Sequence, residues 1–512
     1  MSSVWRTSFD RRTPPAPALR TDRTVDVVVV GAGITGMTLG LLLMEAGLEV
    51  AVLERLELGA GTTGATTAHL TEALDIDYAT LIARFGEDAA RAVARSVRAA
   101  IGEIERRSAV SGRDTGFRRL PGFRWADRSA DLDQLERDAE AAAKIGLDVQ
   151  LVWDVPLPFA TAGALRFPDQ AEIHPLVYLD VLAQGFLAGG GQLYEATPVV
   201  DVSGKHVTVA SGHRVEASYV VDATHTPIGT TPSIQARVFA MTSYVLALQL
   251  AEPLGDGLFW DLDDPYHYVR AVGPLGDRIL VGGGDHHTGR ADDPTRALRE
   301  LEEWARRRFP VESVERRWSG ELFEPADGLP YIGALPTDRT RFVAAGFSGT
   351  GLTFGTVAAL LIRDLVTEGG SPLEDVYAAG RMNPLVSGGT VARENARIAW
   401  RFVADRLRRA DESSRELPPG EGRIERSGGR QVAVFRDQDG VLHRLSPRCR
   451  HLGCMVAWNP LEQTWDCPCH GGRYRGDGTV LYGPPTQDLE PVDDAQHGSS
   501  VPHLPRSPRG AT

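Results

Sequence analysis

The first part of the chain alternates between short, continuously apolar segments and longer segments of helical periodicity. Asp26–Val30 is a run of valines after one aspartate, Gly31–Gly36 is rich in glycine, and Met37–Ala46 has the pattern of a buried helix that stops before Gly47. A second apolar run, Glu49–Leu53, follows directly. Because a strand, a glycine turn, a helix and a strand come in this order, we predict a βαβ unit near the N-terminus.

The chain up to about residue 410 continues with mixed helical and strand patterns. Helices are expected at Tyr78–Val110, Leu132–Ile145, Pro175–Ala188 and Thr356–Val366. Strands bounded by Gly and Ser turns are expected at Gln192–Tyr194, Val199–Val202, His206–Ala210 and Tyr219–Asp222. Strand patterns at Tyr266–Val272 and Arg278–Val281 indicate a second sheet between about residues 230 and 317.

The pattern changes near Ala410. A helix is expected to end around Leu407, and residues 411–422 are charged and rich in proline, which is typical of a linker. Two short strand patterns follow, Gln431–Phe435 and Val441–Leu445, joined by a turn. The C-terminal part is therefore predicted to be a small, separate β domain.

Length and charge narrow the classes of function. A chain of 512 residues is expected to form two or three domains, and its 42% hydrophobic and 24% charged residues are typical of a globular protein. The formal charge of −13 opposes binding to a phosphate backbone, so we expect no nucleic-acid partner. The longest uncharged stretch, Val27–Met44, is too short for a membrane span and is interrupted by glycines. Met1–Arg23 lacks the apolar core of a secretory signal, and we expect a cytoplasmic protein.

The glycines of the predicted βαβ unit have the spacing of a dinucleotide site. Gly31, Gly33 and Gly36 allow a tight turn and close approach of a pyrophosphate to a helix N-terminus. Glu54, at the end of the second strand, is placed to accept hydrogen bonds from a ribose. The alternative is a glycine-rich turn in an unrelated α/β sheet. These residues alone do not separate FAD from NAD.

All four cysteines lie between residues 449 and 469. The window contains Cys449-Arg450-His451 and Cys467-Pro468-Cys469-His470, so two loops each offer a thiolate and an imidazole. Clustered Cys and His in a cytoplasmic chain more often bind a metal than form structural disulfides alone. Tetrahedral zinc is one interpretation. The C-x-H and C-x-x-H spacing, with one extra cysteine in each loop, argues against it.

A family resemblance distinguishes between the nucleotide cofactors. The segment Asp26–Leu70, with Glu54-Arg55, Gly61-Thr62-Thr63-Gly64 and Thr66-Thr67-Ala68-His69-Leu70, resembles the N-terminus of the D-amino-acid oxidase and glycine oxidase family of flavoenzymes. The similarity recurs at Ile173-His174-Pro175, Tyr219–Thr224, Asp327–Gly333 and Gly346–Thr353. It covers most of residues 25–370.

This resemblance implies that the cofactor is FAD and that the late glycine-rich segment meets the isoalloxazine ring. Backbone N–H groups at the start of the helix after Gly351 can stabilise negative charge on a reduced flavin. Some relatives attach FAD through a Cys or a His, but this chain has no Cys there and Ala65 at the His position, so we expect non-covalent FAD. The cofactor-binding residues implied are Gly31, Gly33, Gly36, Glu54, Arg55, Gly61, Thr62, Thr66, Thr67, Val199, Thr224, Gly349, Thr350, Gly351, Leu352 and Thr353.

The cysteine window strongly resembles the Rieske [2Fe–2S] domain, in which a Cys pair binds one iron and a His pair the other. The resemblance assigns Cys449, His451, Cys467 and His470 as metal ligands, and it implies a disulfide between Cys454 and Cys469. Gly483-Pro484-Pro485 matches the proline loop that covers the cluster in such domains.

One position departs from the pattern of high-potential Rieske proteins. These carry a Ser two residues after the last His ligand, where this chain has Gly472, while the Tyr two residues further on is present as Tyr474. The missing donor is expected to lower the reduction potential. We predict a value in the lower or middle part of the Rieske range of about −150 to +300 mV.

Together these features predict the fold class and the domain organisation. We expect an α/β FAD-binding Rossmann-like domain with an interleaved antiparallel-sheet substrate domain over residues 1–410, a linker at 411–422 and a small all-β Rieske domain at 423–505. The FAD-binding parts are expected at about 25–75, 150–229 and 318–405, and the substrate-binding parts at about 76–149 and 230–317.

The combination resembles bacterial FAD-dependent oxidoreductases with a C-terminal Rieske domain. The leading hypothesis is oxidation of a C–N bond in a small-molecule amine or amino acid, with electrons leaving singly through the cluster to a protein partner. The alternatives are a reductase or oxygen-activating enzyme fed through the cluster, a simple oxidase with an accessory Rieske domain, and a non-catalytic redox sensor.

Candidate catalytic residues lie on the second predicted sheet. Tyr266, Tyr268 and Arg270 alternate to one face of a strand, and His286 and His287 follow Asp285 at the end of another. An Arg and a Tyr hold the substrate carboxylate in amino-acid oxidases, and an Arg can do so bidentately. The alternative is that the tyrosines pack within the sheet and that Arg270 forms a surface ion pair.

Overall fold

The computed structural model describes residues 2–229, 231–273, 275–290, 293–407, 416–427 and 429–492. Its helices are α1 (Val4–Ser8), α2 (Ile34–Glu45), α3 (Tyr78–Phe85), α4 (Glu87–Val110), α5 (Leu132–Lys144), α6 (Pro175–Ala188), α7 (Pro232–Gln235), α8 (Pro294–Arg308), α9 (Gly351–Thr367), α10 (Glu374–Tyr377) and α11 (Pro384–Leu407). None of the helices within these ranges is long and apolar enough to cross a membrane.

The first sheet is mainly parallel and contains the predicted βαβ unit. Its strand order is β16 (Tyr331–Leu335), β17 (Asp338–Ala345), β10 (Arg214–Asp222), β1 (Arg23–Val30), β2 (Val50–Leu53) and β7 (Gln192–Tyr194), and β8 (Val199–Ser203) and β9 (His206–Val209) extend β10. The residues Val27–Val30 are buried, as are all four residues of β2, because both faces of the sheet are covered. Helices α2, α6 and α9 pack on one face, and strands β8 and β9 pack on the other. The helix α2 contacts α6 and α9.

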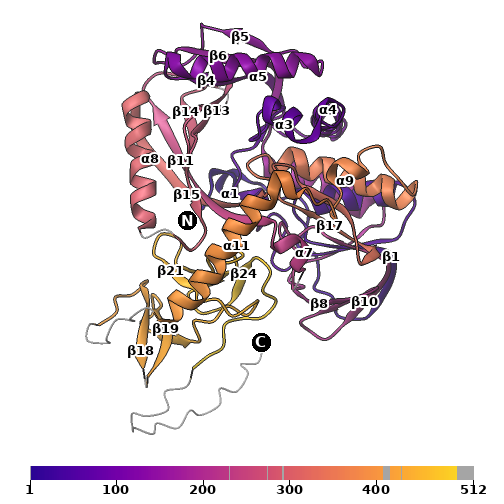
Figure 1. The fold of residues 1–512 in the computed structure, drawn as a ribbon. Helices are drawn as coiled ribbons and strands as arrows, with labels where there is room; N and C mark the ends of the chain where they lie inside the picture. The colour runs from indigo at the N-terminus through magenta and orange to yellow at the C-terminus, as the bar shows by residue number, and fades with distance from the viewer. Residues whose placement is uncertain are drawn as a thin grey trace.

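The second sheet is mainly antiparallel. Its order is β15 (Val311–Pro325), β11 (Val238–Leu250), β14 (Arg278–His287), β13 (Tyr268–Val272), β12 (Leu258–Trp260), β4 (Arg118–Ala126), β6 (Gly163–Glu172) and β3 (His69–Leu70), with β5 (Gln150–Val152) beside β6. The helix α8 lies along this sheet (Figure 1) and buries Leu298, Leu301 and Trp304 against it. The strands β5 and β6 belong to this sheet and lie within the range of about 150–229 that we expect to bind FAD.

The helix expected at Tyr78–Val110 is two helices. Gly86 has φ +84°, a left-handed conformation that ends α3, and α4 begins at the next residue. Glycine adopts this conformation without steric cost, so the chain turns there instead of continuing one long helix.

The C-terminal domain consists of two small antiparallel sheets. One contains β18 (Gly422–Ser427), β19 (Arg430–Arg436) and β20 (Leu442–Leu445), and the other β21 (Ala457–Asn459), β22 (Thr464–Asp466), β23 (Arg473–Arg475) and β24 (Val480–Tyr482). In Figure 1 this domain lies at the end of α11, below the two larger sheets. Part of the expected linker, residues 411–415, lies outside the described residues, and its last residue, Gly422, opens β18. The predicted fold class is confirmed.

Candidate active site and metal centre

A large cavity begins at the glycine turn between β1 and α2. Gly31 has φ +102°, and a Cβ atom there would lie 2.7 Å from the carbonyl oxygen of Ala223. A Cβ atom at Gly36 would lie 1.9 Å from the carbonyl oxygen of Gly31. Only glycine permits this packing, so the turn brings the N-terminus of α2 to the cavity wall.

The cavity runs from this turn past both sheets to the start of α9. All the expected cofactor-binding residues line it except Gly36, which shapes the turn, and Thr353, which is buried within α9. Cavity-lining residues that the sequence did not single out include Thr71, Asp75, His225, Ser243, Trp260, Glu321 and Phe323. They come from segments with no recognisable motif, and only the fold brings them together.

Glu54 is held in place by the backbone. Its Oε2 accepts a hydrogen bond from the amide of Ala32 at 2.9 Å, and its Oε1 accepts one from Leu56 at 2.9 Å. Burial raises the pKa of this carboxyl. Each oxygen keeps a further lone pair that can accept a ribose hydroxyl.

The described residues fit a dinucleotide such as FAD. Gly61 and Gly351 line the cavity, and a Cβ atom at either position would meet no other atom within 4 Å, so both leave room for a bound group. The helix α9 has no side-chain cap at its N-terminus, and its first N–H groups are therefore free to face negative charge.

Aromatic side chains form one wall of the cavity near α9. The rings of Tyr266 and Tyr268 lie 5.6 Å apart, Tyr268 lies 5.9 Å from His69, and His69 lies 5.3 Å from Trp260. Burial lowers the pKa of His69 to about 3, so this ring is neutral. All four residues line the cavity, as does the carboxylate of Asp75.

The other candidate catalytic residues lie elsewhere. Arg270 is only 2% exposed, and its Nη1 pairs with Glu172 Oε2 at 2.8 Å, so it forms a buried ion pair and does not line this cavity. His286 stacks on Tyr244, with ring centres 5.4 Å apart. His287 lies 3.6 Å from a carboxylate oxygen of Glu394 in α11. Of the candidates, only Tyr266 and Tyr268 line the cavity.

The predicted metal ligands meet between two loops of the C-terminal domain. Cys449 and Cys467 are buried free thiols, and the rings of His451 and His470 lie 5.0 Å apart. His451 Nε2 and His470 Nδ1 are buried without a hydrogen-bond partner in the described structure. Burial lowers the pKa of each imidazole to about 4, so both rings are neutral. Two thiols and two neutral imidazoles with unpartnered nitrogens are the donor set of a Rieske cluster.

The surroundings of these ligands tie the two loops together. Cys454 and Cys469 form a disulfide. A Cβ atom at Gly472 would lie 3.1 Å from Pro485 and 3.3 Å from Cys449 Sγ, so the expected proline loop packs directly on the ligand loop.

The two domains share the cavity wall. Leu481, Tyr482 and Gly483 of the C-terminal domain line the same cavity as the glycine turn. The Tyr482 hydroxyl donates to the carbonyl of Ala60 at 3.2 Å, and the amide of Gly229 donates to the carbonyl of Pro484 at 2.9 Å. The C-terminal domain is therefore part of the cofactor site.

A second contact joins the ligand loop to the cavity wall. A Cβ atom at Gly471 would lie 2.6 Å from the Cβ of Ala240, 2.7 Å from Glu321 Oε1 and 3.1 Å from Phe323. Glu321 and Phe323 line the cavity on their other side. Burial raises the pKa of Glu321 to about 8. Glu321 and Phe323 therefore lie both in the cavity wall and against Gly471, the residue next to the predicted ligand His470.

The fold and the two sites define an oxidoreductase built from a nucleotide-binding domain and an iron–sulfur domain. The FAD dependent oxidoreductase family model matches residues 26–365, and the Rieske [2Fe-2S] domain model matches residues 410–493. The chain belongs to the FAD dependent oxidoreductase family and carries a C-terminal Rieske domain. It is an enzyme, and its cofactors are FAD and a [2Fe–2S] cluster, as the sequence predicted.

Similar proteins include one with the same two-domain span. A Bacillus subtilis protein named as a Rieske 2Fe-2S iron-sulfur protein, YhfW, is 31% identical over 96% of this chain and 97% of its own length. Gamma-glutamylputrescine oxidoreductase of Escherichia coli is 27% identical over 76% of this chain and 94% of its own. The crystal structure of glycine oxidase from Geobacillus kaustophilus superposes with a TM-score of 0.59 at 23% identity, over 70% of this chain and all of that one, and shows the shared fold.

Proposed function

We propose that this protein oxidises the C–N bond of an amine or amino acid and passes the electrons one at a time through its Rieske cluster. When bound, FAD accepts two electrons as hydride, and the cluster carries one electron at a time. The observation that carries the proposal is the shared wall: Leu481, Tyr482 and Gly483 of the Rieske domain line the cavity that the glycine turn opens.

The residues of this chain have separable tasks in such a reaction. Gly31 and Gly33 admit the pyrophosphate, Glu54 accepts the ribose hydroxyls, and the uncapped start of α9 favours negative charge at Gly351. Neutral His451 and His470 serve as metal ligands together with the two free thiols. The expectation of non-covalent FAD remains part of this proposal.

The similar proteins favour a C–N substrate. Gamma-glutamylputrescine oxidoreductase and glycine oxidase are both named for nitrogen compounds, and both match the FAD dependent part of the chain. The close contact of Gly471 with Glu321 and Phe323 favours electron exit through the Rieske domain rather than an accessory role for it.

The test is an anaerobic reduction with a panel of amines and amino acids, followed by absorbance for the flavin and electron paramagnetic resonance for the cluster. A substrate is expected to bleach the flavin first, and the signal of the reduced cluster is expected to grow afterwards. If the cluster is reduced first by an external protein and the flavin follows, the proposed direction is wrong.

A variant pair separates relay from simple oxidase. His470→Ala removes a cluster ligand, whereas His443→Ala removes a histidine of the same domain that only pairs with Asp437, at 2.9 Å. We expect His470→Ala to abolish turnover with a one-electron acceptor and His443→Ala to preserve it. Full turnover of His470→Ala with oxygen as the sole acceptor would favour the simple oxidase instead.

A further inference from the structure

The two ends of the cavity differ in charge. Arg55 is the only Arg or Lys among the described residues that line it, and it lies at the nucleotide end, next to Glu54 and 3.4 Å from the carbonyl of Pro485. The end near α9 is lined by Asp75 and by no Arg or Lys of the described residues. The two histidines of the cavity wall, His69 and His225, are neutral because burial lowers the pKa of each ring. This end therefore offers a bound molecule the carboxyl group of Asp75 and no Arg or Lys, and burial raises the pKa of that carboxyl.

Asp75 faces the open cavity and is fixed there by two hydrogen bonds. Its Oδ2 accepts from the amide of Gly349 at 2.7 Å, and its Oδ1 accepts from the Tyr266 hydroxyl at 3.3 Å. Gly349 belongs to the glycine-rich segment before α9, so this carboxylate lies directly beside the expected flavin-binding backbone. Arg124, behind Asp75, pairs with Asp138 at 3.2 Å and does not line the cavity.

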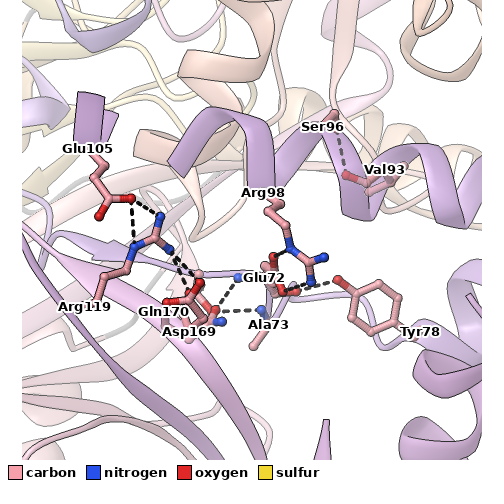
Figure 2. Close-up of polar contacts among 11 residues, drawn as sticks. Glu72, Ala73, Tyr78, Val93, Ser96, Arg98, Glu105, Arg119, Asp169 and Gln170 are labelled. Atoms are coloured by element: carbon pink, nitrogen blue, oxygen red, sulfur yellow. Dashed lines mark hydrogen bonds and ion pairs between the residues drawn. The ribbon is translucent and has the colours of Figure 1, made fainter. Parts of the chain in front are cut away.

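The segment that carries Asp75 is held rigidly. Figure 2 shows that Arg98 donates hydrogen bonds to both carboxylate oxygens of Glu72, at 2.6 and 3.1 Å. The Tyr78 hydroxyl donates to the backbone carbonyl of Glu72 at 2.6 Å. Gln170 accepts from the amide of Glu72 in the same view. Anchors on both sides of Asp75 fix its position at the cavity wall.

A second carboxyl group, that of Asp285, lies behind the aromatic wall, and burial raises its pKa to about 7. Asp285 Oδ1 is buried without a hydrogen-bond partner in the described structure. It lies near Ser243, whose hydroxyl is 2.8 Å from that of Tyr268. The Tyr266 hydroxyl thus contacts Asp75, and the Tyr268 hydroxyl is linked to Asp285 through Ser243.

Arg270, the residue considered for binding a substrate carboxylate, does not line the end of the cavity near α9. Arg270 is neutralised by Glu172, and its charge lies 5.2 Å from the ring centre of Trp5 in α1. It lines a separate hollow with Trp5, His174 and Glu172.

We propose that the substrate is a cationic amine without a carboxylate beside the reacting carbon, and that its ammonium group binds Asp75 against the aromatic wall of Tyr266, Tyr268 and Trp260. Where this nitrogen is the one that reacts, the ammonium passes a proton to the Asp75 carboxylate before the C–H bond breaks. This inference rests on the proposed function and names its substrate class. An ammonium group donates hydrogen bonds to a carboxylate and is attracted by its negative charge. Cations are also attracted to the faces of tyrosine and tryptophan rings. A substrate carboxylate in the same place faces Asp75 with no basic partner, which costs binding free energy.

The first experiment uses substrate pairs that differ by one carboxylate. Flavin reduction is followed anaerobically with 1,4-diaminobutane against ornithine, and with benzylamine against phenylglycine, using both enantiomers of each amino acid. We expect the member without the carboxylate to reduce the flavin at least about tenfold faster in each pair. Faster reduction by the amino acids overturns the inference and leaves the proposed function standing.

The second experiment measures binding without turnover. Benzyltrimethylammonium, a cation with no N–H, is titrated into the oxidised holoenzyme, and the shift of the flavin absorbance gives its Kd. Benzoate serves as the anionic counterpart. The cation is expected to bind and benzoate is not. Tight binding of benzoate without binding of the cation overturns the inference.

A variant pair isolates the carboxylate. Asp75→Asn keeps the shape of the side chain and an oxygen that accepts from the Gly349 amide. It is expected to raise the Kd of benzyltrimethylammonium about tenfold or more. Asp77→Asn is the matched control, because Asp77 caps α3 through Thr80, Asn is an equally good cap, and the residue does not line the cavity. If the two variants bind the cation equally well, Asp75 is not the binding group. If no amine or amino acid reduces the flavin while the cation still binds through Asp75, the proposed function fails and the cation site stands.

Discussion

The hydroxyl of Tyr474 lies 3.1 Å from the sulfur of Cys449 and 2.9 Å from the amide nitrogen of Arg450. Because the amide N–H donates to the hydroxyl oxygen, the hydroxyl proton is directed at the sulfur. A hydrogen bond to a ligand sulfur stabilises the more negative, reduced cluster and raises its potential. This chain keeps that donor and has Gly472 where high-potential relatives of the domain have a serine.

Removing the tyrosine hydroxyl is expected to lower the potential of the cluster. Tyr474→Phe should shift the midpoint downward by tens of millivolts in a redox titration followed by electron paramagnetic resonance. Tyr482→Phe, in the same domain but bonded to Ala60, should leave it unchanged. Conversely, Gly472→Ser should raise the potential, because its Cβ atom would lie 3.3 Å from Cys449 Sγ and bring a hydroxyl donor close to the ligand sulfur. A wild-type potential near the top of the Rieske range would contradict the expected effect of Gly472.

Enlarging Gly471 is expected to slow electron transfer between the domains. A Cβ atom there meets Ala240 and Glu321 within 2.7 Å, so the ligand loop must move away from the cavity wall. In stopped-flow experiments, Gly471→Ala should slow cluster reduction several-fold after the flavin has been reduced. Gly440→Ala is the control, since Gly440 also has a positive φ, of +83°, but its Cβ atom would meet nothing closer than 3.9 Å. If cluster reduction slows equally in both variants, backbone strain explains the slower rate, and the contact of Gly471 with the cavity wall does not.

Closing the glycine turn is expected to remove FAD. A methyl group at Gly36 collides with the carbonyl oxygen of Gly31, so Gly36→Ala should displace the turn and reduce the bound flavin to a small fraction of the wild-type content, measured by absorbance of the purified protein. Gly102→Ala, in α4, meets no atom within 4 Å and should retain full flavin content. Normal flavin content in Gly36→Ala would show that the turn tolerates a side chain.

The disulfide between Cys454 and Cys469 is expected to stabilise the Rieske loops. It closes a loop of 15 residues, for which chain entropy gives about 3 kcal/mol. The double variant Cys454→Ser, Cys469→Ser should therefore lose its cluster absorbance at a lower temperature than the wild type, while flavin release changes less. Wild type treated with a strong reductant should behave like the variant, and unchanged cluster loss in both would assign the stability to the surrounding hydrogen bonds.

His174 is expected to make stability depend on pH. Its Nδ1 accepts from the amide of Val177 at the start of α6, and burial lowers its pKa from 6.5 to about 4. The folded state therefore favours the neutral ring, and the stabilisation is complete above about pH 6.5 and is lost as the pH falls towards 4. At about pH 5 the loss amounts to about 2 kcal/mol.

The variant His174→Asn tests this, because Asn can cap the helix and does not titrate. Its melting temperature should fall less than that of the wild type between pH 7.5 and pH 5. Parallel falls in the two proteins would contradict the shifted pKa.

Sequence patterns predicted local elements better than they predicted which side chains share a cavity. The strand at Gln192–Tyr194 and the helix at Pro175–Ala188 have the predicted bounds, because each is a compact apolar pattern with clear turn residues at its ends. The Rieske domain was predicted from its resemblance to the family, which the cysteine and histidine residues carry because they lie within two short segments of the chain.

The alternation of Tyr266, Tyr268 and Arg270 shows the limit of such patterns. The strand expected at Tyr266–Val272 begins only at Tyr268, so Tyr266 lies before it. Period-two spacing also does not state where the cavity along one face of a strand ends. Trp5, from the far N-terminal end of the chain, and Glu172 cover Arg270, while the two tyrosines stay open to the cavity. Asp75 carries no motif either, and only its hydrogen bond to Gly349 reveals its place.

The carbonyl of Ala60 accepts hydrogen bonds from Arg6, near the start of the chain, and from Tyr482, near its end. A polypeptide is synthesised from the N-terminus, so the glycine turn, the carboxylate of Glu54 and the aromatic wall are all made long before Leu481–Gly483, which contribute their part of the cavity wall. If FAD binds while the chain is still being synthesised, folding of the iron–sulfur domain then completes the wall around the bound FAD. A defect in cluster assembly would consequently also lower the amount of FAD that the protein retains.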